Sequence, residues 1–322
     1  MKKHKICKIL LVILAIFLCV AFYELLGICV AYKKQPEVSN TTKKETKNGS
    51  WNECSENTER AVIIEKNPEA LLQRVRLIKN AKKEIILSTF AFQSDESGKL
   101  ILGALHDAAD RGVHIRLLVD GMESWIDMEG NPYFYGLSSH ENVEIKLYNK
   151  ANPLKPWKMM GRMHDKYLIA DGKRYILGGR NTYNYFLGDF PGHKNYDRDV
   201  LVVCDEPEKE NSVNQLSEYF ETIWEQEDSG YFHDNKKLAN RKSVKNAVLE
   251  LQNGYQKYFE ENKERICDTD YTDETFETEK IALVSNPIHT GPKEPVVWYQ
   301  LGELMKNAKE RVKIHNHPYP AS

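Results

Sequence analysis

The chain has 322 residues, of which 41% are hydrophobic and 29% are charged, a balance that is ordinary for a globular protein with a buried core. Residues 1–34 hold six lysines and one glutamate. The rest of the chain has 39 basic and 46 acidic residues, which gives a formal charge of −7. This acidic balance argues against a broad nucleic-acid-binding surface, because such binding depends on neutralising phosphates.

The N-terminus carries an apolar run of 24 residues, 9–32, interrupted only by Glu24. Such a run is long enough to cross a bilayer as a helix. Four lysines precede it and two follow it, which favours a cytoplasmic N-terminus and an exported remainder. A cleaved signal peptide is the alternative, but no small-residue cleavage site precedes Lys33. We therefore predict that residues 1–34 anchor the chain in the cell membrane by a single span, with the globular part on the extracytoplasmic side.

The six cysteines divide evenly, three in or beside the apolar run and three beyond it, at Cys54, Cys204 and Cys267. The latter three lack metal-ligand spacing, and either one disulfide or a set of thiols is compatible with them. Residues 35–60 are polar with almost no apolar content and are predicted to form a linker.

The folded part begins near residue 61, where apolar spacing starts to alternate between helical and strand-like periods. Helices are predicted at 68–83, 98–113 and 212–227, and strands at 84–92, 114–121, 143–149, 163–170, 174–177 and 199–205. Strand–helix–strand alternation of this kind predicts an α/β lobe over residues 61–227, with functional sites at the strand ends.

The rest of the chain divides into a polar, acidic connector at 228–279, helical around 244–251, and a final segment at 280–322. Within that segment, residues 304–314 repeat the pattern of residues 77–87 at an offset of 227. Chance similarity is one explanation of the repeat. The other is that residues 280–322 begin a second α/β lobe related to the first.

The stretch from 163 to 181, "MHDKYLIADGKRYILGGRN", holds the clearest chemical pattern. Side chains two apart on a strand share a face, so His164 and Lys166 point the same way. An ammonium can neutralise the non-bridging oxygens of a phosphate while an imidazole attacks the phosphorus. Gly178 and Gly179 allow the backbone to approach an anion, and the Asn181 amide can donate a hydrogen bond to it.

Each of these residues also has a structural explanation when it is taken alone. A single histidine can lie on the surface or in the core, and a lysine can be solvated. Asp171 before Gly172 suits the tight turn of any β-hairpin, and two glycines can simply end a strand. The joint pattern is what favours a phosphodiester site.

That joint pattern resembles the phospholipase D superfamily, whose signature is His-x-Lys-x4-Asp followed by Gly-Gly or Gly-Ser, any residue and Asn. His164, Lys166 and Asp171 occupy the first part, and Gly178, Gly179 and Asn181 the second. "LILGALHDAADRGVHIRLLVDG" and "DRDVLVV" resemble the cardiolipin synthase-like branch, and the resemblance extends over about residues 61–322. It implies a phospholipase D-like mixed sheet flanked by helices, with one complete lobe and the start of a second.

The resemblance also implies a two-step transfer without metal or cofactor. His164 would attack the phosphodiester to form a phosphohistidine, or act as the acid, and Lys166 and Asn181 would hold the phosphoryl oxygens. Asp171 would orient and charge-stabilise a histidine. The implied substrate is a membrane phospholipid, with an alcohol such as the head group of phosphatidylglycerol as acceptor. The basic loop at 150–166 fits a lipid surface and equally a solvated linker.

The sequence departs from the family pattern in one respect that concerns catalytic activity. A second motif would place its histidine near position 391, and the late histidines of this chain have no lysine two residues on. Loss of general acid catalysis typically lowers a rate by ~10²–10⁴-fold. We therefore expect a truncated phosphatidyltransferase that is inactive or weakly active. The alternatives are a homodimeric phosphodiesterase or nuclease that builds its site from two chains, and a non-catalytic remnant that binds lipid phosphate.

Overall fold

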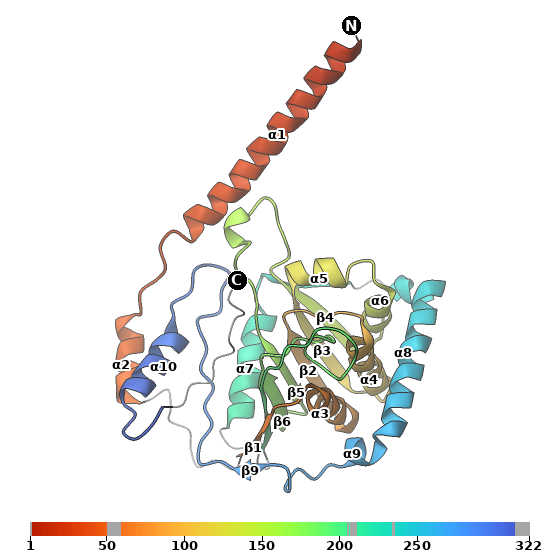
Figure 1. Ribbon diagram of the computed structural model, residues 1–322, viewed down its shortest axis with the longest axis vertical. Coiled ribbons are helices and arrows are strands. Elements are labelled where there is room, and N and C mark those ends of the chain that lie inside the picture. Colours follow the sequence, from red (N-terminus) through yellow and green to blue (C-terminus); the bar gives the residue numbers. More distant parts are fainter. Residues whose placement is uncertain (1, 50–58, 205, 207–210, 234–235, 313–322) are drawn as a thin grey trace.

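A computed structural model describes residues 2–49, 59–204, 206, 211–233 and 236–312. Cys54 and the end of the repeat after residue 312 lie outside the described residues. Helix α1 (Lys2–Ala31) projects from a globular part built around one large sheet (Figure 1). Within α1, the segment Lys5–Ala31 is 27 residues long and none of its most apolar window is buried in the protein. By length and composition this helix can cross a membrane.

The described part of the sheet has nine strands in the order β8-β4-β3-β2-β5-β6-β7-β1-β9. β2, β3 and β4 run parallel, and every other pairing is antiparallel. The strands are β1 (Glu59–Ile64), β2 (Glu84–Thr89), β3 (His114–Asp120), β4 (Val143–Tyr148), β5 (Lys166–Ala170), β6 (Arg174–Gly178), β7 (Asp199–Cys204), β8 (Ser229–Tyr231) and β9 (Phe276–Glu277). The predicted mixed α/β sheet flanked by helices is confirmed.

The two faces of the sheet are covered unequally (Figure 1). One face packs against α3 (Asn67–Asn80), α4 (Glu96–Asp110) and α6 (Pro132–Ser138), with α9 (Lys263–Cys267) beside α3. α8 (Lys242–Glu261) packs on α4 and α6. The other face packs against α7 (Ser212–Trp224) and apolar side chains of the extended segment 281–288. The site described below lies at one end of this sheet, between these two layers.

The polar segment after α1 differs from the predicted tether. Residues Asn40–Asn48 form helix α2, which begins at an N-cap where the Ser39 hydroxyl accepts from the backbone N–H of Thr42 at 3.1 Å. α2 lies beside α10 (Val296–Lys306), and the backbone N–H of Ser39 donates to the Glu294 carboxylate at 2.8 Å. Caps and a tertiary contact therefore hold a helix whose sequence has no apolar periodicity.

Residues 228–279, which the sequence predicts to be a connector, also contribute strands to the sheet. β8 pairs with β4 at one edge of the sheet, and β9 pairs with β1 at the other. Strands of two or three residues are too short to show a periodicity, which is why the sequence does not predict them. In the last segment a helix precedes residue 307 as expected, and residues 309–312 are not in a strand. The assignment of 280–322 to a second lobe stays a prediction.

Candidate active site

His164 and Lys166 lie where β5 begins, beside the carboxyl ends of β2 and β3. The register pairs Lys166 with Thr89, the last residue of β2, and Asp120 ends the neighbouring β3. His164 is exposed, whereas Lys166 is only 5% exposed. The structure thus places both residues at the carboxyl end of the parallel strands, where α/β sheets commonly hold their sites.

Lys166 provides a buried positive charge at this end of the sheet. Its Nζ donates to the backbone carbonyl of His164 at 2.7 Å. Desolvation lowers its pKa to about 8, although Asp165 and Asp197 oppose the shift. The ammonium is therefore still mostly protonated at neutral pH, and its low-dielectric surroundings strengthen its attraction for an anion.

The surroundings of His164 favour the neutral form of its imidazole. The pKa of His164 lies below the ordinary 6.5, mainly because the ring is partly buried. The Lys166 charge lowers this pKa further, whereas the negative charges of Asp165 and Asp120 oppose the shift. An unprotonated ring nitrogen is what a nucleophilic histidine requires. The exposed ring and its charge state together fit attack on an incoming phosphodiester.

Phe90, directly after β2, contacts three side chains at this end of the sheet, two of which are cationic. Its ring centre lies 4.6 Å from that of His164, 5.1 Å from the Arg162 guanidinium carbon and 5.3 Å from Lys166 Nζ. Such contacts stabilise cations over an aromatic face. This role is not predicted from the sequence, where Phe90 is one more apolar residue of a strand.

Asp120 holds the loop that leads to His164. Its buried carboxylate accepts from Arg162 Nε at 2.8 Å and Nη2 at 2.6 Å, and from the backbone N–H of Met163 at 3.0 Å. It also caps the N-terminus of α5 (Gly121–Asp127). On the other side of the histidine, Asp165 accepts from the Tyr219 hydroxyl of α7 at 2.8 Å, and burial raises the pKa of Asp165. Both neighbours of His164 are thereby fixed.

The predicted phosphate-binding loop follows β6 at the same end of the sheet. A side chain at Gly178 would overlap the Asp199 carboxylate, and one at Gly179 would overlap that of Asp197. The Asn181 side-chain oxygen accepts from the backbone N–H of Ala91 at 3.2 Å. This bond orients the amide so that its nitrogen is the group available to donate to an anion.

A buried ion cluster supports that loop. Asp199 Oδ2 lies 2.9 Å from Arg74 Nη1 and 3.3 Å from Arg180 Nη1, and the three side chains are between 0% and 4% exposed. Arg180 also donates to the carbonyls of Ile64 and Glu65. Arg180, which lies between Gly179 and Asn181, is therefore bonded to residues of β1, α3 and β7.

Asp171 lies at the opposite end of β5 from His164. Its carboxylate accepts three hydrogen bonds of 2.7–3.0 Å from the backbone N–H groups of residues 82–84. Its φ of 55° and the 61° of Gly172 form the tight turn of the hairpin. Asp171 therefore does not contact His164 within this chain, and its carboxylate joins the hairpin turn to the start of β2.

We expect Asp171→Ala to lower the stability of the lobe without removing the chemistry at His164. Charged hydrogen bonds of this kind contribute about 1.5–3 kcal/mol. Thermal unfolding of Asp171→Ala should show this loss, and Asp171→Asn should lose less, because asparagine keeps an acceptor and tolerates the positive φ. A folded Asp171→Ala protein that no longer reacts at His164 would contradict this role.

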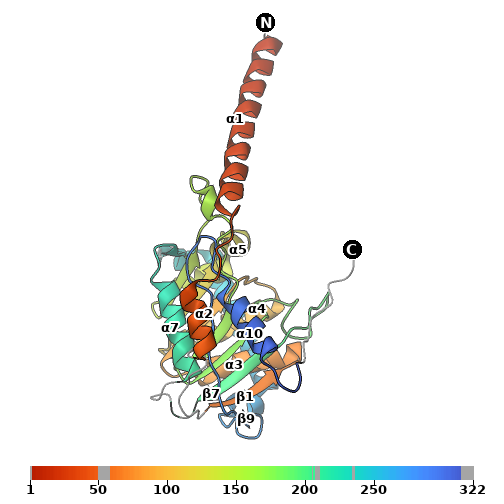
Figure 2. The same cartoon turned by 90° about the vertical axis from the view of Figure 1, so that its left-hand side faces the viewer.

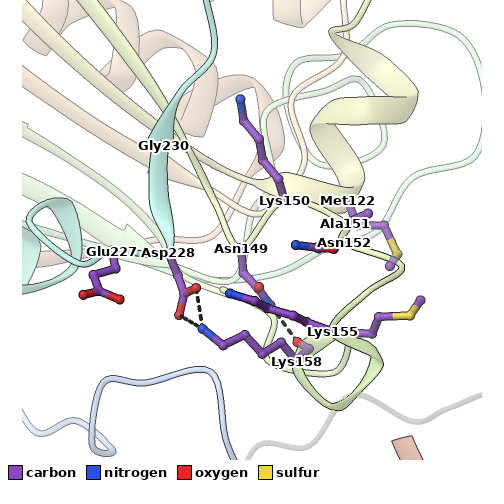
Figure 3. Close-up of a pocket in the computed structure, with 11 residues that line it drawn as sticks. Met122, Asn149, Lys150, Ala151, Asn152, Lys155, Lys158, Glu227, Asp228 and Gly230 are labelled. Atoms are coloured by element: carbon purple, nitrogen blue, oxygen red, sulfur yellow. Dashed lines mark hydrogen bonds and ion pairs between the residues drawn. The ribbon is translucent and has the colours of Figure 1, made fainter. Parts of the chain in front are cut away.

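A cavity of about 250 Å³ lies near the site, between α5 and the loop that contains the short 3₁₀ helix η2 (Pro156–Lys158) (Figure 3). Met122, Lys150, Asn152 and Lys155 are among its lining residues. Lys158 Nζ pairs with the Asp228 carboxylate at 2.7 Å across it. Its lining combines apolar side chains with three lysines and two acidic residues, Glu227 and Asp228, and it does not include His164 or Lys166.

Solved structures similar to this chain include NucT from Helicobacter pylori, at 16% identity and a TM-score of 0.43. That match covers 54% of this chain and 99% of NucT. A phosphatidylserine synthase from Haemophilus influenzae matches at 17% identity with a TM-score of 0.46, over 69% of this chain and 48% of the synthase.

Sequence relatives include an uncharacterized protein of Helicobacter pylori, 30% identical over 61% of this chain and 39% of its own length. Cardiolipin synthase C of Escherichia coli is 29% identical over 49% of this chain and 34% of its own length. The chain thus spans well under half the length of these relatives. A family model described as "Cardiolipin synthase, PLD-like domain" matches residues 74–224, the part that contains every candidate site residue. Residues 74–224 of this chain thus match a phospholipase D-like domain.

Proposed function

We propose that this chain is a phospholipase D-type phosphatidyltransferase or phosphodiesterase that acts on membrane phospholipids through a phosphohistidine at His164. The observation that carries the proposal is the pairing at the start of β5. An exposed histidine, with its pKa lowered toward the neutral form, stands next to a mostly buried lysine ammonium. The match to a cardiolipin synthase domain and the apolar helix α1 support a lipid as the substrate.

In the first step, a ring nitrogen of His164 attacks the phosphorus of the phosphodiester. A P–N bond forms, the P–O bond to the leaving alcohol breaks, and that oxygen takes up a proton. Lys166 and the Asn181 amide would hold the non-bridging oxygens, on which negative charge builds up in the transition state. Because Lys166 is anchored to the His164 carbonyl, its charge keeps a constant position relative to the nucleophile.

In the second step, the acceptor attacks the phosphohistidine. The P–N bond breaks, a new P–O bond forms, and the acceptor loses its proton to a base. A lipid alcohol as acceptor gives a new phospholipid, whereas water gives phosphatidic acid. The proton donor of the first step would be a second histidine by the family resemblance, and a second copy of this chain could supply it. Without that donor the first step is ~10²–10⁴-fold slower, but it still produces the covalent intermediate.

The direct test is to trap this intermediate on the full chain in vesicles that contain phosphatidylglycerol labelled in its phosphate. Denaturation at alkaline pH preserves a phosphohistidine, and peptide mass spectrometry locates it. We expect the label on His164 and none in His164→Asn. His114→Asn is the matched control, since His114 lies at the far end of β3 and pairs with Glu144 at 3.0 Å. Folded protein without label, or with the label elsewhere, would overturn the proposal.

The two pKa shifts predict a bell-shaped pH profile for kcat/KM. Activity needs neutral His164, so it rises as pH increases through a pKa below 6.5. It also needs protonated Lys166, so it falls as pH increases through about 8. Lys166→Arg keeps its charge at high pH and should lose the alkaline limb, at a lower maximal rate. An unchanged alkaline limb in Lys166→Arg would assign that limb to another group.

A further inference from the structure

Five large apolar side chains are exposed at the end of the lobe nearest α1. Two are on α5, and three are in the loop around η2. They are Trp125 (69% exposed), Ile126 (67%), Leu154 (78%), Trp157 (46%) and Met160 (58%). We call these five residues the docking face. Tryptophan beside aliphatic side chains is typical of surfaces that lie at the boundary between lipid headgroups and acyl chains.

The position of α1 fixes what lies over the loop half of this face. Tyr23 of α1 donates to the backbone carbonyl of Leu154 at 3.1 Å. Gly27 packs so closely on Pro156 that a Cβ atom there would lie 2.5 Å from the proline ring. Both contacts fall inside the apolar segment Lys5–Ala31, and Tyr23 lies eight residues, or ~12 Å, before its end. A bilayer crossed by α1 must therefore touch this loop (Figures 1 and 2).

The α5 half of the face is joined to the loop through the cavity described above. Met122 of α5 and Lys150, Asn152 and Lys155 of the loop line the same space (Figure 3). Lys150 Nζ donates to the backbone carbonyl of Tyr231 at 2.7 Å and keeps two further N–H groups for a phosphate, and Lys155 is exposed. Lysines between two groups of exposed apolar side chains match a surface of anionic headgroups over acyl chains.

We propose that the docking face is a second membrane-contact surface, in addition to α1. Its apolar side chains enter the headgroup–acyl boundary of the leaflet from which α1 emerges, and Lys150 and Lys155 face anionic lipid phosphates. α5 begins at the carboxyl end of β3, the same end of the sheet that holds His164. The candidate active site consequently opens toward the lipid surface. This proposal rests on α1 crossing a bilayer and not on the catalytic proposal.

The test uses tryptophan fluorescence of the full chain in vesicles of phosphatidylcholine and phosphatidylglycerol. The lipids carry bromine near the headgroup end of the acyl chains, where it quenches only tryptophans at that depth. Three variants each keep one exposed tryptophan, Trp125, Trp157 or Trp298, together with the buried Trp224, and have phenylalanine at the other positions. Trp298 is the matched control, because it is 73% exposed but lies on α10, away from the docking face.

We expect Trp125 and Trp157 to be quenched at least about twofold more strongly than Trp298. Trp125 decides the outcome, because the contact of η2 with α1 brings Trp157 close to the bilayer in any case. Quenching of Trp125 no stronger than that of Trp298 overturns the proposal, whether or not the protein forms a phosphohistidine. Equal quenching of Trp125 in vesicles of phosphatidylcholine alone would overturn the role of the two lysines.

Discussion

His164→Asn is expected to lower turnover of phosphatidylglycerol by about 10⁴-fold or more, the size of effect seen when a covalent nucleophile is removed. Asparagine is close to the imidazole in size and polarity, but the lone pair of its amide nitrogen is delocalised into the carbonyl and does not attack phosphorus. The fold should be unaffected, since the histidine is exposed and its neighbours are held by Asp120 and Tyr219.

The comparison that makes this result specific is His114→Asn, which removes a partly exposed imidazole at the other end of β3. Its turnover should match that of the unaltered chain, and both variants should unfold at the same temperature as that chain. Product formed in vesicles would be followed by thin-layer chromatography of labelled lipid. Residual turnover of His164→Asn within tenfold of the unaltered chain would exclude this residue as the nucleophile.

Asp199→Asn is expected to be the most destabilising single change near the site. It leaves the buried guanidinium groups of Arg74 and Arg180 without their shared anion, which typically costs 3–5 kcal/mol, or roughly 6–20 °C in Tm for a lobe of this size. The loop that carries Gly179 and Asn181 should loosen with it, so the bound phosphoryl group loses a donor as well.

The neighbouring residue provides the control for Asp199. Arg198 pairs with Glu65 at 3.0 Å, but the two side chains are 44% and 60% exposed. Arg198→Ala should therefore cost no more than about 1 kcal/mol. Thermal unfolding in detergent compares the two variants. A loss of stability in Asp199→Asn as small as that of Arg198→Ala would show that the buried cluster does not hold the loop.

The long elements of the lobe could be predicted from the sequence because each has a clear period. α4, β3, β4 and α7 begin and end within a few residues of the predicted bounds. The exceptions lack such a period. α2 has no apolar face and depends on its caps, and β8 and β9 are too short to show alternation, so only their pairing partners in the finished sheet define them.

The candidate site divides in a similar way. Motif spacing located His164, Lys166 and the Gly-Gly-x-Asn loop, which the structure brings to one end of the sheet. It could not predict Phe90 or Asp120, because an apolar ring and a strand-end carboxylate acquire a role only when β2 and β3 lie next to β5. Asp171 is the opposite case, because it occupies a motif position but its contacts are structural.

Three hydrogen bonds join α1 and the residues after it to the globular part, from Tyr23 to Leu154, from Tyr32 to Thr290 and from Ser39 to Glu294. With α1 in a bilayer, the lobe and the lipids then diffuse in the same plane. Turnover should follow the mole fraction of phosphatidylglycerol within the vesicle and not its bulk concentration. Dilution with neutral lipid would slow each enzyme molecule, whereas dilution of the vesicles with buffer would leave its rate unchanged.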